Sequence, residues 1–170
     1  GGDGTLDEVV SGLICLEKRP PLGYIPAGTT NDFAKSLGIS SNMTAAAANV
    51  LHGAPFAIDV GVFNDRNFAY VAAFGAFTDV SWQTPQQLKN TFGHLAYLME
   101  GLKSLPSITP HRMTVEFDDE VITDSFAYGM VTNSVSVGGF KSINGKDMEL
   151  DDGLFEMLLV RMPKNLFELQ

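Results

Sequence analysis

The sequence predicts an α/β segment with a partial parallel sheet over residues 1–57, followed by an antiparallel β-domain with a helical insertion. In residues 1–57, segments with an apolar helical period alternate with a short apolar segment of strand type. The connections between them are short, which is typical of a parallel sheet. From Phe56 onward, strand-like runs are separated by short polar turns, and an apolar helical period interrupts them between residues 84 and 104.

Residues 1–57 are expected to begin with a glycine turn at residues 1–4 and a helix over residues 5–18. Thr5 and Glu8 have the spacing of a capping box for this helix. A short strand is predicted at residues 22–25, a short helix through residues 33–37 and an alanine-rich helix over residues 43–51. A glycine turn of this kind normally follows a strand, so we expect that strand to precede Gly1 in a larger protein.

Residues 58–162 are expected to form the second domain. The segments 56–63 and 67–74 predict a hairpin with its turn at residues 64–66. Strands are predicted at residues 112–117 and 121–133, with a turn at 118–120, and a last strand at 154–161. Residues 163–170 are expected to start a helix that returns towards the first domain.

The chain is acidic, with a net charge of −9 and a sequence pI near 4.6. This balance argues against nucleic acid as a partner, because such binding depends on neutralising phosphates with Lys and Arg. No signal peptide is visible, and no run of about 18 apolar residues could span a bilayer. We therefore expect a cytoplasmic protein.

The turn at Gly1–Thr5 has the composition of a phosphate-binding loop. Glycines let the backbone approach an anion closely, and the helix that follows directs its free N–H groups at it. The loop lacks the Gly-Lys-Ser/Thr of a Walker A motif. Asp3 is unusual in such a loop unless a metal ion or a ribose offsets its charge. The alternative is a glycine-rich turn without a ligand.

A second polar segment, Gly28–Asp32, lies at the next predicted strand-to-helix junction. Two such loops side by side at the carboxyl edge of a parallel sheet form the usual ligand site of that architecture. Taken alone, the segment is better explained as a capped helix, since Thr, Asn and Asp are all good caps. The pairing of the two loops favours a ligand site.

The two segments GGDGTLDEVV (1–10) and PAGTTNDFA (26–34) resemble the catalytic-domain signature of the diacylglycerol kinase and sphingosine kinase superfamily. Within it they are most similar to the soluble bacterial diacylglycerol kinases. NAD kinases and phosphofructokinases share the first motif but not the second. Similar blocks at residues 74–81, 93–97, 138–140 and 151–155 extend the resemblance over nearly the whole chain.

This resemblance implies a phosphofructokinase- or NAD-kinase-like nucleotide-binding domain followed by a β-sandwich, with ATP and the lipid meeting in the cleft between them. The implied activity is ATP-dependent phosphorylation of diacylglycerol to phosphatidic acid by a peripherally membrane-associated enzyme. A kinase of another lipid alcohol, such as a sphingoid base or phosphatidylglycerol, and a non-catalytic nucleotide-binding regulator stay open as alternatives. Pairing with a second copy of the chain is also left open.

The resemblance also implies site residues. Asp3, acting through Mg²⁺ or the ribose, Asp32 and Asp59 would be catalytic, although Asp59 also fits a polar residue at a strand end. The residues implied for ATP are Gly1, Gly2, Asp3, Gly4, Thr5, Leu6, Asp7, Gly28, Thr29 and Asn31.

A structural Mg²⁺ site is implied at the Asp-Asp-Gly turn, with the Asp152 carboxylate and the carbonyls of Glu149 and Leu154 as oxygen ligands. The alternative is an acidic turn that needs no ion. Phosphorylation of an alcohol needs a base near the hydroxyl. The family takes it from an Asp-Gly-Glu segment expected beyond Gln170, so residues 1–170 alone are expected to be inactive.

The segment from Trp82 to Arg112 combines aromatic residues with Lys89 and Lys103 in an otherwise acidic chain. Such a mixture suits docking to an anionic membrane surface. The alternative is a helix pair that covers the sheet.

Overall fold

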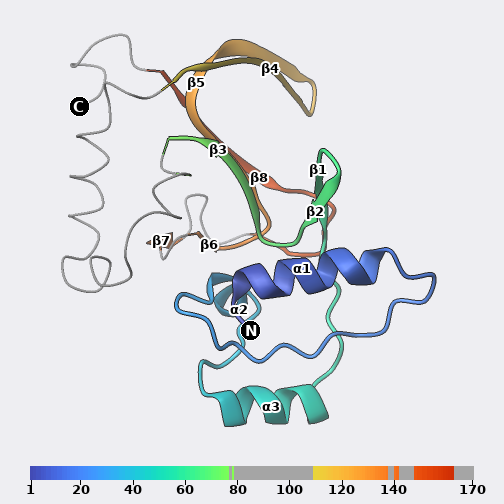
Figure 1. Ribbon diagram of the computed structural model, residues 1–170. Helices are drawn as coiled ribbons and strands as arrows, with labels where there is room; N and C mark the ends of the chain where they lie inside the picture. Colours follow the sequence, from blue (N-terminus) through green and yellow to red (C-terminus); the bar gives the residue numbers. More distant parts are fainter. Residues whose placement is uncertain (77, 79–108, 138–139, 142–147, 163–170) are drawn as a thin grey trace, which may run out of the picture. The chain divides into compact units, whose positions relative to one another are not determined.

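The computed structural model describes residues 1–76, 78, 109–137, 140–141 and 148–162 (Figure 1). The described chain is a mixed α/β structure with antiparallel sheets. Its elements are α1 (Asp3–Ile14), α2 (Asp32–Ser36), α3 (Met43–His52), β1 (Gly61–Phe63), β2 (Arg66–Phe68), β3 (Val71–Gly75), β4 (His111–Phe117), β5 (Glu120–Thr132), β6 (Ser136–Val137), β7 (Phe140–Lys141) and β8 (Glu156–Arg161).

The chain divides into two compact units. The first comprises Gly1–Ala72 together with Val131–Glu156, and the rest of the described chain belongs to the second. The core of the first unit is built by apolar side chains of α1, the segment between α1 and α2, α2 and the segment that precedes β3. These buried residues are Leu6, Val10, Tyr24, Phe33, Ala34 and Ala69.

Helix α1 begins at Asp3, so the predicted capping box at Thr5 and Glu8 is wrong. Gly2 occupies the N-cap position in an extended conformation, and its carbonyl accepts a hydrogen bond from Leu6 N at 3.0 Å. Thr5 therefore lies inside the first turn. The helix starts earlier than predicted because the glycine backbone accepts this hydrogen bond. It also ends earlier, at Ile14.

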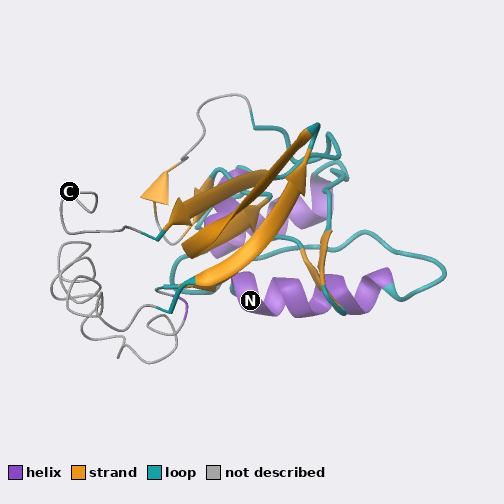
Figure 2. Ribbon diagram, turned by 90° about the horizontal axis from the view of Figure 1, so that it is seen from above, coloured by secondary structure: helices purple, strands orange, loops and turns teal. Residues whose placement is uncertain are grey.

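Residues 15–31, which include the predicted strand at 22–25, form no regular element and are drawn as a loop in Figure 2. The Gly1 amino group nevertheless donates to the Ile25 carbonyl at 3.0 Å, and Ala27 N donates to the Gly1 carbonyl at 2.8 Å. Two hydrogen bonds in this arrangement are the repeating unit of a parallel ladder. Within the described residues, these two hydrogen bonds are the feature that corresponds to the predicted parallel sheet.

The predicted antiparallel sheets are present, but the predicted strand at 67–74 is split into β2 and β3, which belong to different sheets. Strands β1 and β2 form a hairpin whose turn contains Asn64 at φ 56°, and β4 and β5 form another, with Asp118 at φ 48° in its turn. A four-stranded sheet has the order β3-β5-β4, with β8 also paired to β5. The predicted helical insertion and the helix at 163–170 lie outside the described residues.

None of the helices that the structure describes is both long enough and apolar enough to cross a membrane.

Helix α3 carries a side-chain cap, from which a stability prediction follows. Asn42 Oδ1 accepts hydrogen bonds from Thr44 N at 3.0 Å and Ala45 N at 3.1 Å. We expect Asn42→Ala to lower the free energy of unfolding by about 1 kcal/mol, because two helix N–H groups lose their acceptor. Asn42→Asp keeps an acceptor and serves as the control. Equal urea midpoints for the two variants would contradict this role.

Candidate functional site

The two glycine loops touch through their backbones. A Cβ atom built on Gly28 would lie 2.6 Å from the Cα of Gly2, and one built on Gly2 would lie 3.1 Å from the Cα of Gly28. Contacts below 3.0 Å are essentially never made by real Cβ atoms. Glycine is therefore required at position 28 by the other loop, whereas the sequence had suggested only the approach of a phosphate.

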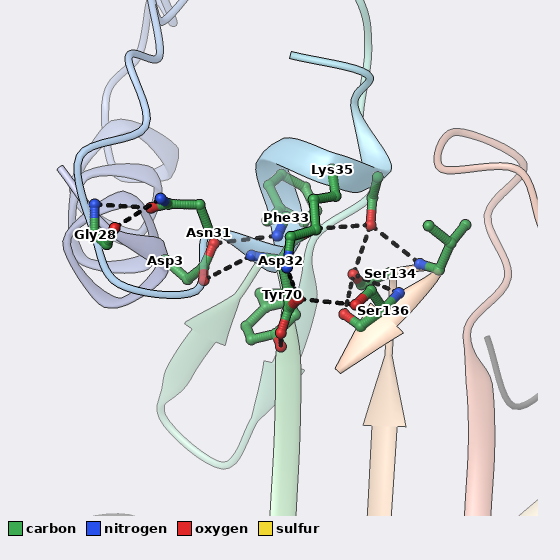
Figure 3. A network of polar contacts seen from close by, with 11 residues as sticks. Asp3, Gly28, Asn31, Asp32, Phe33, Lys35, Tyr70, Ser134 and Ser136 are labelled. Atoms are coloured by element: carbon green, nitrogen blue, oxygen red, sulfur yellow. Dashed lines mark hydrogen bonds and ion pairs between the residues drawn. The ribbon is translucent and has the colours of Figure 1, made fainter. Parts of the chain in front are cut away.

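Asp3 joins the same two loops by hydrogen bonds. Its carboxylate accepts from Asp32 N at 3.0 Å and from Phe33 N at 3.1 Å, at the beginning of α2 (Figure 3). Backbone N–H groups at a helix start are orphan donors, and hydrogen bonds from them to a carboxylate are stronger than neutral ones. The negative charge that is unusual in a glycine loop is thus partly offset by the second loop itself.

Asn31 closes the second loop on itself. It adopts the left-handed conformation, with φ 51° and ψ 49°, which asparagine tolerates better than most residues. Its Oδ1 atom accepts from Gly28 N at 2.8 Å, and its Nδ2 atom donates to the Gly28 carbonyl at 2.8 Å. The loop conformation is therefore fixed by its own side chain.

Asp32 is a buried carboxylate, with a side chain only 1% exposed. Its Oδ1 atom accepts from Lys35 Nζ at 2.9 Å and from Ser136 Oγ at 2.8 Å, and its Oδ2 atom accepts from Tyr70 OH at 3.0 Å (Figure 3). A buried charge is tolerated only when it is paired and hydrogen-bonded, and here both conditions are met. The carboxylate is consequently held in one position.

Sequence reasoning missed the serines of this cluster. Ser36 Oγ lies 2.7 Å from Ser134 Oγ and accepts from Val135 N at 3.1 Å, while Ser134 Oγ donates to the Ser136 carbonyl at 2.7 Å. All three serines are buried or half-buried. A polar signal existed in the sequence, because Asn-Ser-Val-Ser begins at the last residue of a predicted strand.

The remaining residues of the first loop lie in different surroundings. Leu6 belongs to the core, whereas Gly4 and Thr5 are exposed. Asp7 Oδ1 accepts from Ala69 N at 2.8 Å, so this side chain contacts the segment before β3. Their assignment to ATP, like that of the exposed Thr29, stays a prediction.

Tyr24 lies beside Asp3 with its hydroxyl group buried. Burial and the neighbouring negative charge of Asp3 raise the pKa of the Tyr24 hydroxyl to about 12. The phenol is therefore neutral under all physiological conditions.

Asp59 meets the Asp-Asp-Gly turn. Its Oδ2 atom accepts from Gly153 N at 2.6 Å, and its own N donates to the Leu150 carbonyl at 2.7 Å. Gly153 has φ 79°, which disfavours residues with a side chain, and Asp152 Oδ1 accepts from Leu154 N at 2.9 Å. One predicted catalytic residue and the predicted magnesium turn thus come together.

The turn offers oxygen atoms of the kind that Mg²⁺ binds, so its chemistry fits the predicted metal. The described contact of the Asp152 carboxylate uses one of its two oxygen atoms. Among the residues that the structure describes, no three His, Cys, Asp or Glu side chains surround a common metal position. A site here would depend on backbone carbonyls, as the assignment of Glu149 and Leu154 assumes.

Asp7 leads to a prediction on pH dependence. Burial raises the pKa of its carboxyl above the ordinary 3.8, the Ala69 N–H lowers it by less, and the charge of Glu8 raises it further. The native state therefore binds the proton up to a higher pH than the unfolded state, and stability falls as pH rises through this window.

We expect Asp7→Asn to remove this part of the pH dependence, because the amide oxygen still accepts from Ala69 N without a buried charge. Urea unfolding between pH 3.5 and pH 7 measures it, with the exposed Asp65→Asn as the control. A variant that is less stable than the wild type at pH 7 and equally stable at low pH would contradict this.

Comparison with known proteins gives one consistent result. Residues 1–63 match the family model of the diacylglycerol kinase catalytic domain. The chain is 40% identical over 162 residues to a diacylglycerol kinase of Bacillus subtilis (strain 168), which covers 95% of this chain and 53% of that protein. A diacylglycerol kinase of Staphylococcus saprophyticus is 37% identical over 169 residues, 99% of this chain and 55% of its own length.

The fold is shared as well. A crystal structure of a diacylglycerol kinase from Bacillus anthracis str. Sterne superposes with a TM-score of 0.71 at 28% identity, over 99% of this chain and 58% of that one. The chain spans about half the length of the curated relatives it matches. Both glycine loops, Gly1–Thr5 and Gly28–Asp32, lie inside the matched residues 1–63. Residues 1–63 therefore carry the match to the diacylglycerol kinase catalytic-domain family, and the chain as a whole is similar to part of these diacylglycerol kinases.

Proposed function

We propose that the full-length protein is a lipid kinase that transfers the γ-phosphoryl group of ATP to the hydroxyl of diacylglycerol and releases phosphatidic acid. The observation that carries this proposal is the joining of the two family motifs by Asp3 and by the Gly2–Gly28 contact. Two loops that begin helices are thereby held against each other. The relatives that the chain resembles bear the name diacylglycerol kinase, which supports the same activity.

The exposed start of α1 is the proposed phosphate contact. A Cβ atom built on Gly4 would have no atom within 4 Å, so packing does not require glycine there. Glycine weakens a helix, and its presence in the first turn needs another reason. Close approach of a phosphate to the N–H groups of this turn, which lack intrahelical acceptors, supplies that reason.

Catalysis would rest on positioning and on charge neutralisation, which dominate phosphoryl transfer. Mg²⁺ bound with ATP would offset the negative charge of the phosphates. The hydrogen bonds to Asp3 and Asp32 fix the orientation of both carboxylates. We propose that these two carboxylates orient the bound Mg²⁺·ATP. The Asp152 turn would hold a second, structural Mg²⁺. The base that takes the hydroxyl proton is expected from residues after Gln170.

Diacylglycerol resides in membranes, so the proposed reaction takes place at a bilayer surface with the enzyme bound peripherally in the cytoplasm. This proposal has three further parts. The protein has two domains divided near residue 57, it docks to the membrane surface through residues 82–112, and two copies of the chain pair.

Transfer from γ-labelled ATP to a lipid panel tests the activity of the full-length protein. We expect labelled phosphatidic acid from diacylglycerol vesicles in the presence of Mg²⁺, and no transfer when Mg²⁺ is chelated. Label in sphingoid base or phosphatidylglycerol alone would identify another kinase of this family. ATP binding without any labelled lipid would favour a regulatory protein instead.

Two glycines of α1 separate ligand binding from helix stability. Gly4 and Gly12 are both exposed, and a Cβ atom at either would meet nothing within 4 Å. Each substitution to alanine is expected to stabilise the helix by up to about 1 kcal/mol. Of the two variants, only Gly4→Ala should weaken ATP binding, by about tenfold, which corresponds to about 1.4 kcal/mol. Calorimetric titration with ATP measures this, and equal affinities for the two variants would contradict a phosphate contact at Gly4.

A further inference from the structure

Asn133 lies directly after β5 and is completely buried, with 0% of its surface exposed. Its backbone N donates to the Tyr70 carbonyl at 3.0 Å. Its side-chain Nδ2 atom donates to two carbonyls, those of Asp59 and Leu150, each at 3.1 Å. One residue therefore binds three separate segments of the first unit.

These segments lead to the two groups of predicted site residues. On one side, the hydroxyl of Tyr70 donates to Asp32 Oδ2 at 3.0 Å, next to the loop that Asp3 caps. On the other side, the Asp59 carboxylate accepts from Gly153 N in the Asp-Asp-Gly turn. Asn133 thus connects the Asp32 cluster and the Asp59 cluster, through its hydrogen bonds to the main chain of Tyr70 and Asp59 and through the side chains of these two residues.

The choice of asparagine is costly for folding. Its Oδ1 atom is buried and has no hydrogen-bond partner within the described part of the chain. A buried acceptor without a partner destabilises the native state, so such groups in native proteins call for an explanation. The Asn133 side chain has such an explanation, because its amide donor binds the carbonyls of both Asp59 and Leu150 and holds the two segments together.

We propose that Asn133 is a positioning residue, which sets where the Asp59 carboxylate lies relative to the Asp32 carboxylate. This inference rests on the proposed lipid kinase function. Without the side-chain amide of residue 133, the backbone carbonyls of Asp59 and Leu150 would each lose a hydrogen-bond donor. Tyr70 would stay in place, because the backbone N of residue 133 and Thr132 Oγ1, at 2.8 Å, still donate to its carbonyl.

The neighbouring Thr132 provides a matched control. It is also buried, at 4% exposure, and Thr132→Val removes one hydrogen bond to Tyr70 without touching the Asp59 segment. Asn133→Ser removes the long amide donor, and Asn133→Asp keeps the volume while replacing the donor by an acceptor. All three variants are compared with the wild type in the full-length protein.

With diacylglycerol vesicles and Mg²⁺·ATP, we expect both Asn133 variants to lose at least tenfold in kcat. The Mg²⁺ concentration for half-maximal activity should rise severalfold, and the KM for diacylglycerol should stay within twofold. Thr132→Val should keep all three values within twofold of the wild type. The thermal unfolding midpoints of all variants are measured alongside, because a purely structural role would lower activity only through the fraction of unfolded protein at the assay temperature.

Three outcomes would overturn the inference. Kinetic constants of the Asn133 variants equal to those of Thr132→Val would remove the positioning role while leaving the lipid kinase activity intact. Failure of both Asn133 variants to fold would show a structural role instead. A wild-type protein that labels no lipid would overturn the proposed function, and this inference with it.

Discussion

The first unit depends on the two hydrogen bonds that the Asp3 carboxylate accepts from the start of α2. They join segments about thirty positions apart in sequence, and they do so with a charged acceptor. Hydrogen bonds to a charged acceptor are roughly twice as strong as neutral ones. This contact helps to hold Gly2 against Gly28, together with the backbone hydrogen bonds from Gly1 to Ile25 and from Ala27 to Gly1, and the left-handed Asn31 fixes the conformation of the second loop.

A buried charge follows from this arrangement. With α2 fixed against the first loop, Asp32 lies inside the protein and its ionised form needs compensation. Lys35 supplies the positive charge, and Tyr70 and Ser136 supply hydrogen bonds from two other segments. Removal of any one of these partners would leave a poorly solvated carboxylate. The cluster is therefore rigid, which is what a phosphoryl-transfer site needs from its acidic residues.

Elements with a local signal were predictable from the sequence. Helix α3 and the β4–β5 hairpin lie within a residue or two of the predicted bounds, because alanine content, apolar alternation and turn residues act at short range. The predicted start of the first helix was wrong, since α1 begins at Asp3, with Gly2 at the N-cap and no capping side chain.

In the site, the pairing of the two loops was predictable from their motifs, and both motifs lie within the matched residues of the family. The partners of Asp3, Asp32 and Asp59 were not predictable. Each of these carboxylates accepts from a residue at least 29 positions away, and no local pattern announces such a contact. Asn133 was overlooked for the same reason, because its importance comes from three carbonyls that are distant in the chain.

The contact between Gly2 and Gly28 also restricts how this sequence can vary. A side chain at position 28 would push against the main chain of residue 2, so the first loop would have to retreat before the second could change. No compensating substitution at position 2 can remove the main-chain atoms that cause this clash. A chimera that takes the two motifs from different parents therefore requires glycine at position 28 in the parent that supplies the second motif.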